Sequence, residues 1–131
     1  LGLLGHSDAD VVTHALMDAL LGAAALGDIG QHFPDTDPAY RDISSLDLLG
    51  RVMALLAAQG WRVENVDLTI LAQRPKLKDY LPQMSQNYSR AMGLPVTAIS
   101  VKATTEEGLG FTGTEQGIAA HGVVLLEPLG K

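Results

Sequence analysis

The chain contains no cysteine, few basic residues and no long apolar run. Without cysteine, disulfides and thiolate metal sites are excluded, so a metal site must use His, Asp or Glu ligands. Only nine Lys and Arg stand against fifteen Asp and Glu, and this argues against binding to nucleic acids or anionic membranes. The longest apolar stretch, Ala19–Gly27, is too short to span a bilayer. An apolar content of 47% in 131 residues is typical of one globular domain, over 1–131.

The periodicity of apolar residues and the turn residues between them predict an α/β chain. Helices are expected over 8–26, 45–59 and 78–92, and strands over 63–72, 99–103 and 119–126. Ser7 and Ser44 are the expected N-caps, and the stretch 30–40 is expected to be a loop. This order indicates an α/β (α+β) sandwich with helices on one face of a mixed β-sheet. Leu1–Leu4 resembles the end of a strand, so we expect the domain's N-terminal strand region to precede Leu1.

The first predicted helix carries polar residues that packing alone does not explain. Asp10, His14 and Asp18 are four residues apart and therefore share one face. His14 could bind zinc, with Asp18 orienting its second ring nitrogen. Alternatively, His14 is a histidine at the edge of the core that Asp10 or Asp18 satisfies. The spacing leaves both interpretations open.

Polar residues at both ends of this helix have two interpretations each. His6 and Ser7 lie at its start, where free N–H groups favour anions, but where simple capping is equally common. Asp28, Asp35 and Asp37 follow its end, and clustered carboxylates there could bind hydroxyl groups or cations. Because aspartate is also an ordinary turn residue, the turn interpretation is favoured.

Three motifs in the second half follow predicted strands. The run Lys102–Glu107 places hydroxyls and a carboxylate beside a Gly-rich turn. This arrangement suits the binding of phosphate together with a hard cation, but it is equally consistent with an ordinary polar strand end. Gln73–Lys76 could meet phosphate or be a solvated loop. The pattern GxGxxG over Gly108–Gly113 is not a dinucleotide site, because no long helix follows it. His121 is expected to be packed within the last strand.

The segments GHSDADVVTHALMDALLGAAALGDIGQHFPDTDP, ILAQRPK and VKATTEEGLGFTG together resemble the 2-C-methyl-D-erythritol 2,4-cyclodiphosphate synthase family. The resemblance runs in register over nearly the whole chain. It implies a homotrimer with active sites between subunits, in a bacterial cytoplasm or a plastid. It also implies a cytidine diphosphate substrate, 4-diphosphocytidyl-2-C-methyl-D-erythritol 2-phosphate. The enzyme would convert this substrate to the cyclic diphosphate and release CMP, which is a step of non-mevalonate isoprenoid biosynthesis.

The resemblance assigns roles to individual residues. His6 and Ser7 would hold substrate phosphate, and His6 and Thr105 would stabilise the transition state. The methylerythritol unit would meet Asp28, Ile29 and Gly30, and the adjoining loop would comprise Phe33, Pro34, Asp35, Thr36 and Asp37. The cytidine pocket would comprise Ala72, Gln73, Arg74, Pro75, Lys76, Leu77 and Lys78. The cytidine diphosphate part would meet Thr104, Thr105, Glu106 and Glu107, with Phe111 bordering the site and the trimer centre.

The same resemblance implies two metals, zinc at His14 and a magnesium or manganese ion at Glu107. The family completes its zinc site with an Asp-x-His pair near its N-terminus, and no such pair precedes His6 here. Thr114 and Gln116 stand where the family commonly has Arg and Glu at the trimer centre, so we expect no prenyl-diphosphate ligand there. Two alternatives remain: a zinc-dependent phosphodiesterase, and a catalytically impaired trimeric homologue that binds metal or nucleotide.

Overall fold

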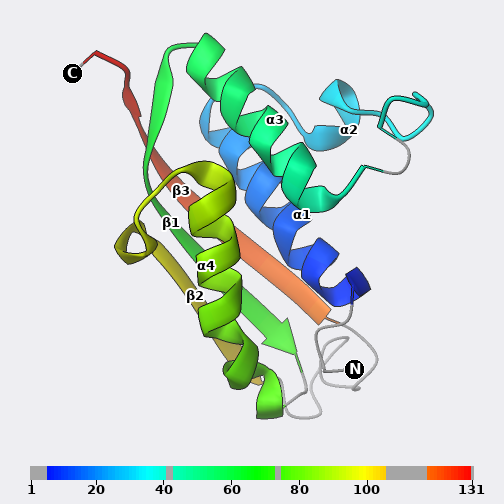
Figure 1. The fold of residues 1–131 in the computed structure, drawn as a ribbon, viewed down its shortest axis with the longest axis vertical. Coiled ribbons are helices and arrows are strands. Elements are labelled where there is room, and N and C mark those ends of the chain that lie inside the picture. The colour runs from blue at the N-terminus through cyan, green and yellow to red at the C-terminus, as the bar shows by residue number, and fades with distance from the viewer. Residues whose placement is uncertain (1–5, 41–42, 73–74, 106–117, 131) are drawn as a thin grey trace.

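The computed structural model describes residues 6–40, 43–72, 75–105 and 118–130 (Figure 1). Its helices are α1 (His6–Ala23), α2 (Ile29–His32), α3 (Ser45–Ala58) and α4 (Leu81–Met92). Its strands are β1 (Trp61–Ala72), β2 (Ile99–Thr105) and β3 (Ile118–Pro128), and 3₁₀ turns span Pro75–Tyr80 and Val96–Ala98. Among the described residues no helix is both long enough and apolar enough to cross a membrane.

The described strands form one mixed sheet in the order β2-β1-β3. β1 runs parallel to β2 and antiparallel to β3. Because the carboxyl ends of parallel strands meet at one edge, Ala72 pairs with Thr105 there. The prediction of a mixed sheet is confirmed, and the strands that carry Ala72 and Thr105, both expected to contact the cytidine diphosphate part, end side by side.

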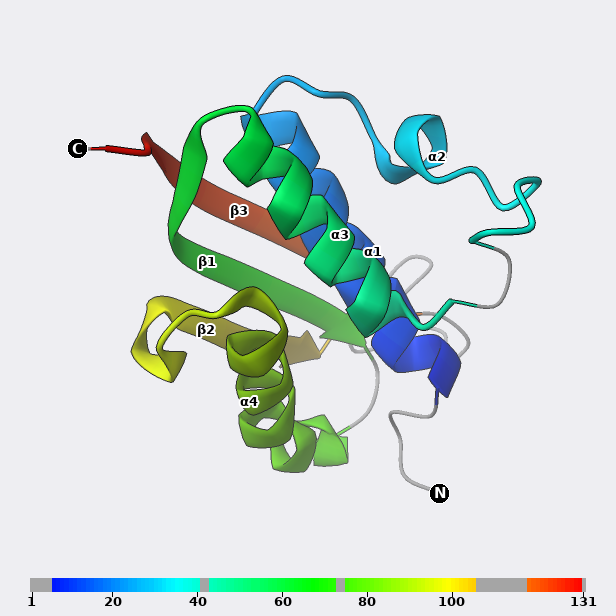
Figure 2. The same cartoon turned by 45° about the horizontal axis from the view of Figure 1, so that its top comes forward.

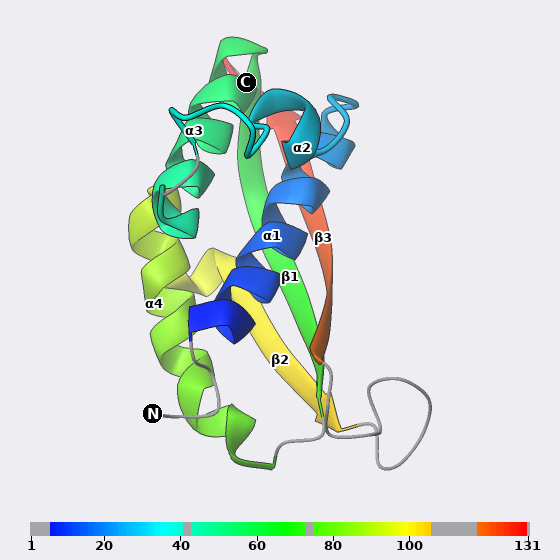
Figure 3. The ribbon, with the colours of Figure 1, turned by 90° about the vertical axis from the view of Figure 1, so that its right-hand side faces the viewer.

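The long helices cover one face of this sheet, as expected (Figures 2 and 3). α1 lies over β3, α4 lies over β2, and α3 packs between α1 and α4. The core between the layers is built from aliphatic side chains such as Leu16, Leu49, Leu68 and Ile70, all fully buried. Leu16 belongs to the apolar side of α1, so burying that side turns the opposite, polar side outward.

α3 begins where the sequence predicts, because its cap is a local signal. The Ser44 side chain accepts a hydrogen bond from the Asp47 backbone N–H at 3.1 Å. The apolar periodicity of this helix predicts a buried face of Leu46, Leu49, Val52, Met53 and Leu56, and this is partly wrong: Leu46 is 37% exposed, whereas Leu48 is buried. α3 packs against α1, α4 and β1 together, and this rotates its buried face.

α1 starts and ends earlier than expected. It begins at His6, so Ser7 lies inside its first turn instead of capping it. It ends at Ala23, where the N–H of Ala25 bonds the Gly22 carbonyl and the N–H of Leu26 bonds the Leu21 carbonyl. This pair of bonds is a Schellman ending, with Ala25 in the left-handed conformation that glycine usually supplies. The predicted stop at Gly27 is therefore wrong, although Gly27 also has a positive φ.

Candidate functional site

A cleft of about 410 Å³ opens between α1, the N-terminal end of α3 and the segment around α2. Six residues with predicted roles line it: His14, Ile29, Gly30, Phe33, Pro34 and Asp35. The structure therefore brings the proposed zinc ligand and most of the proposed methylerythritol contacts to one place. Five further residues complete the lining: Asp10, Tyr40, Ile43, Ser45 and Leu48.

The polar face of α1 supplies one wall of this cleft. His14 is exposed there, and within the described part of the chain no hydrogen bond joins it to Asp10 or Asp18. Asp10 instead accepts a hydrogen bond from the Ser45 hydroxyl at 2.6 Å. Asp18 accepts from the Ile29 backbone N–H at 3.0 Å, so it anchors α2 and does not orient His14.

The segment around α2 is more ordered than the loop that the sequence predicts. Asp28 caps α2 by accepting from the Gln31 N–H at 3.1 Å, and Nε2–H of His32 donates to the Leu26 carbonyl at 2.6 Å. Asp37 accepts from the Ala39 N–H at 2.9 Å. The turn interpretation is confirmed for Asp28 and Asp37.

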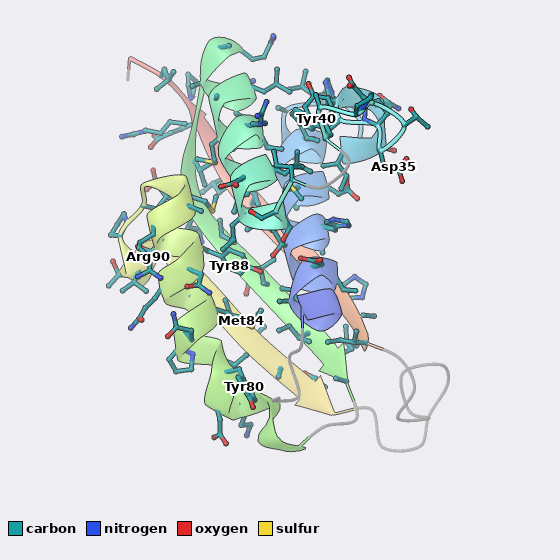
Figure 4. All side chains as sticks on the ribbon, turned by 45° about the vertical axis from the view of Figure 1, so that its right-hand side comes forward. Asp35, Tyr40, Tyr80, Met84, Tyr88 and Arg90 are labelled. Carbon is teal, nitrogen blue, oxygen red and sulfur yellow. The ribbon has the colours of Figure 1, made fainter. Side chains whose placement is uncertain are left out.

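Asp35 and Tyr40 follow α2 and lie near each other in Figure 4. Tyr40 meets Phe33 edge-to-face, with ring centroids 5.2 Å apart, and the Arg51 guanidinium of α3 lies 5.7 Å from the Tyr40 ring centre. Cation–π and aromatic contacts of this kind stabilise by about 0.5–1.5 kcal/mol each. They hold the segment that carries Asp35 against α3, across the cleft from His14.

The remaining predicted residues lie at other places. Ala72, Thr104 and Thr105 end the paired strands, Pro75–Lys78 form the 3₁₀ turn, and His6 and Ser7 lie in the first turn of α1. Thr36 does not line the cleft. Seven of the positions with predicted roles lie outside the described residues: Gln73, Arg74, Glu106, Glu107, Phe111, Thr114 and Gln116. His121 is exposed on the sheet face away from the helices, so the prediction that it is packed is wrong.

The described residues do not complete a zinc site by themselves. They contain no group of three or more His, Asp or Glu side chains close enough to share a metal ion. A zinc site uses at least three protein ligands, and His14 is one candidate ligand. A zinc centre at His14 therefore needs ligands from beyond the described part of this chain.

Behind the polar wall, α4 is tied to α1 by a buried pair of hydroxyl groups. Tyr88 points from α4 toward α1 (Figure 4), and its hydroxyl lies 2.9 Å from the Thr13 hydroxyl. Both side chains are buried, at 2% and 3% exposure. Thr13 also donates to the Ala9 carbonyl at 2.9 Å. This contact fixes the turn of α1 that carries Asp10 and His14.

Burial of Tyr88 predicts a loss of stability at alkaline pH. Burial raises the pKa of Tyr88 from 10.0 to about 12. The unfolded chain loses this proton first, so the stabilisation is complete below pH 10 and is lost as pH rises from 10 to about 12. At about 1.4 kcal/mol per pKa unit, the free energy of unfolding should fall by about 2–3 kcal/mol. Urea unfolding between pH 9 and 11.5 measures this fall, and an equal slope in Tyr88→Phe would contradict it.

Four residues of the cleft have no signal in the sequence: Tyr40, Ile43, Ser45 and Leu48. They come from α3 and from the chain just before it, and they reach the cleft because α3 packs on α1. Ser45 looks like any residue in the first turn of a helix. Its contact with Asp10 spans 35 positions, so only the tertiary structure reveals it.

Comparison with known proteins decides the family. The family model described as the YgbB family matches residues 1–127. The chain belongs to the YgbB family. Two relatives carry the name 2-C-methyl-D-erythritol 2,4-cyclodiphosphate synthase. The one from Trichlorobacter lovleyi is 61% identical over 97% of this chain and 81% of its own length, and the one from Syntrophomonas wolfei is 62% identical over 96% and 80%.

Solved structures of the YgbB fold agree with these relatives. The bifunctional IspDF of Campylobacter jejuni matches with a TM-score of 0.87 and 43% identity, over 98% of this chain and 35% of that one. A CDP-bound 2C-methyl-D-erythritol-2,4-cyclodiphosphate synthase matches with a TM-score of 0.83 and 41% identity, over 96% and 81%. The CDP complex of IspF from Plasmodium falciparum matches at 0.80 and 32% identity, over 95% and 75%. The resemblance predicted from the sequence is confirmed.

Proposed function

We propose that this chain cyclises 4-diphosphocytidyl-2-C-methyl-D-erythritol 2-phosphate to 2-C-methyl-D-erythritol 2,4-cyclodiphosphate and releases CMP. One observation carries the proposal: relatives about 60% identical over nearly the whole chain bear the name of this synthase. The cleft beside His14 supports it, because it gathers polar and apolar groups at the positions expected for the methylerythritol unit. Two similar structures contain CDP, which supports a cytidine ligand.

The reaction needs positioning more than acid–base chemistry. An oxygen of the 2-phosphate attacks the β-phosphorus, a new P–O bond forms, and the P–O bond to CMP breaks so that CMP leaves with the electron pair. Because the nucleophile is already an anion, catalysis comes from orientation and charge neutralisation. We assign phosphate binding to His6 and Ser7 and transition-state stabilisation to His6 and Thr105. Helix N-termini favour anions, and His6 and Ser7 lie at the start of α1.

Two cations are part of the proposal, zinc at His14 and magnesium or manganese at Glu107. When bound, each would neutralise phosphate charge. The role of His14 itself is to present an exposed imidazole to the cleft, opposite the wall that Phe33 and Asp35 form. In the sequence Glu107 comes two residues after Thr105, the last residue of β2, which pairs with Ala72 at the end of β1.

We also propose that the chain assembles as a homotrimer through the sheet face that the helices leave open. That face carries Val123 and Leu125 on β3, which are 70% and 58% exposed. Large aliphatic side chains at this exposure are typical of surfaces that a partner covers. Sedimentation of the full chain at micromolar concentration should give the trimer mass, and a monomer would contradict this part of the proposal.

Product analysis tests the proposed reaction against hydrolysis. The chain is incubated with the cytidylylated substrate, zinc and magnesium, and the products are followed by ³¹P NMR. We expect a cyclic diphosphate to appear in equal amount to CMP. The linear 2-C-methyl-D-erythritol 2,4-bisphosphate alongside CMP would instead indicate a phosphodiesterase that uses water as nucleophile, and would overturn the proposal.

A further inference from the structure

A thin wall separates the cleft from a second cavity. This second cavity, of about 140 Å³, lies between α1, α4 and the N-terminal end of α3. Among the residues described, only Asp10 and Ser45 line both spaces. The side chains of these two residues therefore form the partition between the candidate site and the cavity behind it.

The partition is closed by a single strong contact. The Ser45 hydroxyl donates to Oδ1 of Asp10 at 2.6 Å, in a partly buried position. This distance lies at the short end of the range for hydroxyl donors, as is usual for a hydrogen bond to a carboxylate group. The neighbouring Ser44 has a different task, because its side chain caps α3 through the Asp47 N–H. The two adjacent serines therefore have different roles: Ser44 caps the helix, and Ser45 contacts the cleft residue Asp10.

The contact decides which partner Asp10 takes. Asp10 and His14 are one helical turn apart, a spacing at which side chains on a helix meet. Although they could pair, no hydrogen bond joins them in the described structure, and His14 stays exposed in the cleft. Without the Ser45 hydroxyl, the half-buried Asp10 carboxylate loses its hydrogen-bond donor. Because an unpaired, half-buried carboxylate is unfavourable, the side chain is expected to turn to another donor. The imidazole of His14, one helical turn away, is the donor that we expect it to take.

The backbone of this turn cannot easily move instead. Thr13 lies between Asp10 and His14 in sequence, and its hydroxyl is held by Tyr88 from α4. α1 is therefore fixed on the side away from the cleft. Loss of the Ser45 contact would change the direction of the Asp10 side chain more than the position of the helix.

We propose that Ser45 is a positioning residue of the cleft: its hydroxyl holds the Asp10 carboxylate against α3 and keeps the His14 imidazole free to meet the ligand. The geometric part of this inference is independent of the proposed function. Its kinetic consequence rests on that function, because it requires the cleft to bind the substrate of the cyclisation.

The test compares Ser45→Ala with Ser45→Thr and Ser44→Ala in the full chain. The ring nitrogens of His14 are followed by ¹⁵N NMR at one fixed pH, with His14→Gln assigning the resonances. We expect Ser45→Ala to shift the His14 resonances as Asp10 turns to the ring. Ser45→Thr, which restores a hydroxyl, and Ser44→Ala, which removes only the cap, should leave them unchanged. Should Ser45→Ala not fold, Ser45→Cys keeps the volume with a weaker donor and gives the same readout.

Kinetic measurements on the same variants are the second part of this test. For CMP release we expect Ser45→Ala to lower kcat/KM by roughly tenfold, since misplaced groups of this kind cost one to two orders of magnitude. Ser44→Ala should lower Tm yet keep kcat/KM within about twofold, which separates positioning from stability. Unchanged His14 resonances in Ser45→Ala, or an equal shift in Ser44→Ala, would overturn the inference. If the wild-type chain releases no CMP, the proposed function fails, and the NMR comparison still decides the role of Ser45.

Discussion

Replacement of His14 by alanine is expected to lower kcat/KM for CMP release by at least about a hundredfold. His14 is the exposed imidazole in the wall of the cleft, opposite the residues that we assign to the methylerythritol unit. Removing one group that neutralises developing charge in a preorganised site costs about two to three orders of magnitude. Initial rates of CMP release over a range of substrate concentrations measure the loss.

Stability should not change with this substitution. His14 is exposed and takes no part in the core, so its removal leaves the packing of α1 intact. Gln86→Ala is the matched control, because Gln86 is an exposed side chain on α4 that lines neither the cleft nor the second cavity. A His14→Ala variant that keeps the wild-type rate would show that the chemistry lies elsewhere.

Replacement of Gly122 by valine should destabilise the fold by about 2–3 kcal/mol, as overpacking of a tight contact does. α1 approaches the sheet closely at this residue of β3. A Cβ atom added at Gly122 would lie 3.1 Å from Cβ of Ala19 and 3.3 Å from the Ala15 carbonyl oxygen, on the helix above. Valine adds two methyl groups to a Cβ atom that is already in tight contact, so we expect α1 to move away from the sheet and to carry His14 with it.

Thermal unfolding at fixed protein concentration measures this effect. Gly50→Ala is the control, because a Cβ atom there meets nothing within 4 Å and Gly50 lies inside α3. It should stabilise the protein by up to about 1 kcal/mol, as Gly→Ala does in helix interiors. If Gly122→Val and Gly50→Ala changed the Tm in the same direction, the close approach of α1 and β3 would be refuted.

Elements marked by local signals could be predicted from the sequence. A serine directly before an apolar stripe places the start of α3 correctly, because the cap and the stripe act within one turn. β1 is found from its β-branched run. By contrast, α2 is a single turn without periodicity, and the end of α1 depends on a left-handed alanine, Ala25, that no composition rule marks.

The residues of the candidate site also divide into those that the sequence predicts and those that only the structure reveals. His14 and Asp35 could be proposed from spacing and resemblance, and the structure places both in one cleft. The hydrogen-bond partners of the carboxylates on α1 could not be predicted from the sequence. Asp18 bonds Ile29, 11 positions along the chain, and Asp10 bonds Ser45, 35 positions along the chain. Both contacts depend on how α1 packs against later elements, which periodicity does not report.

The most direct test of the proposed function is CMP release by the 131-residue chain, supplied with the cytidylylated methylerythritol 2-phosphate, zinc and magnesium. We expect turnover that depends on His14 and is lost when the divalent cations are chelated. Binding of the substrate without release of CMP under these conditions would contradict it, and would favour a homologue that binds its ligand without transforming it.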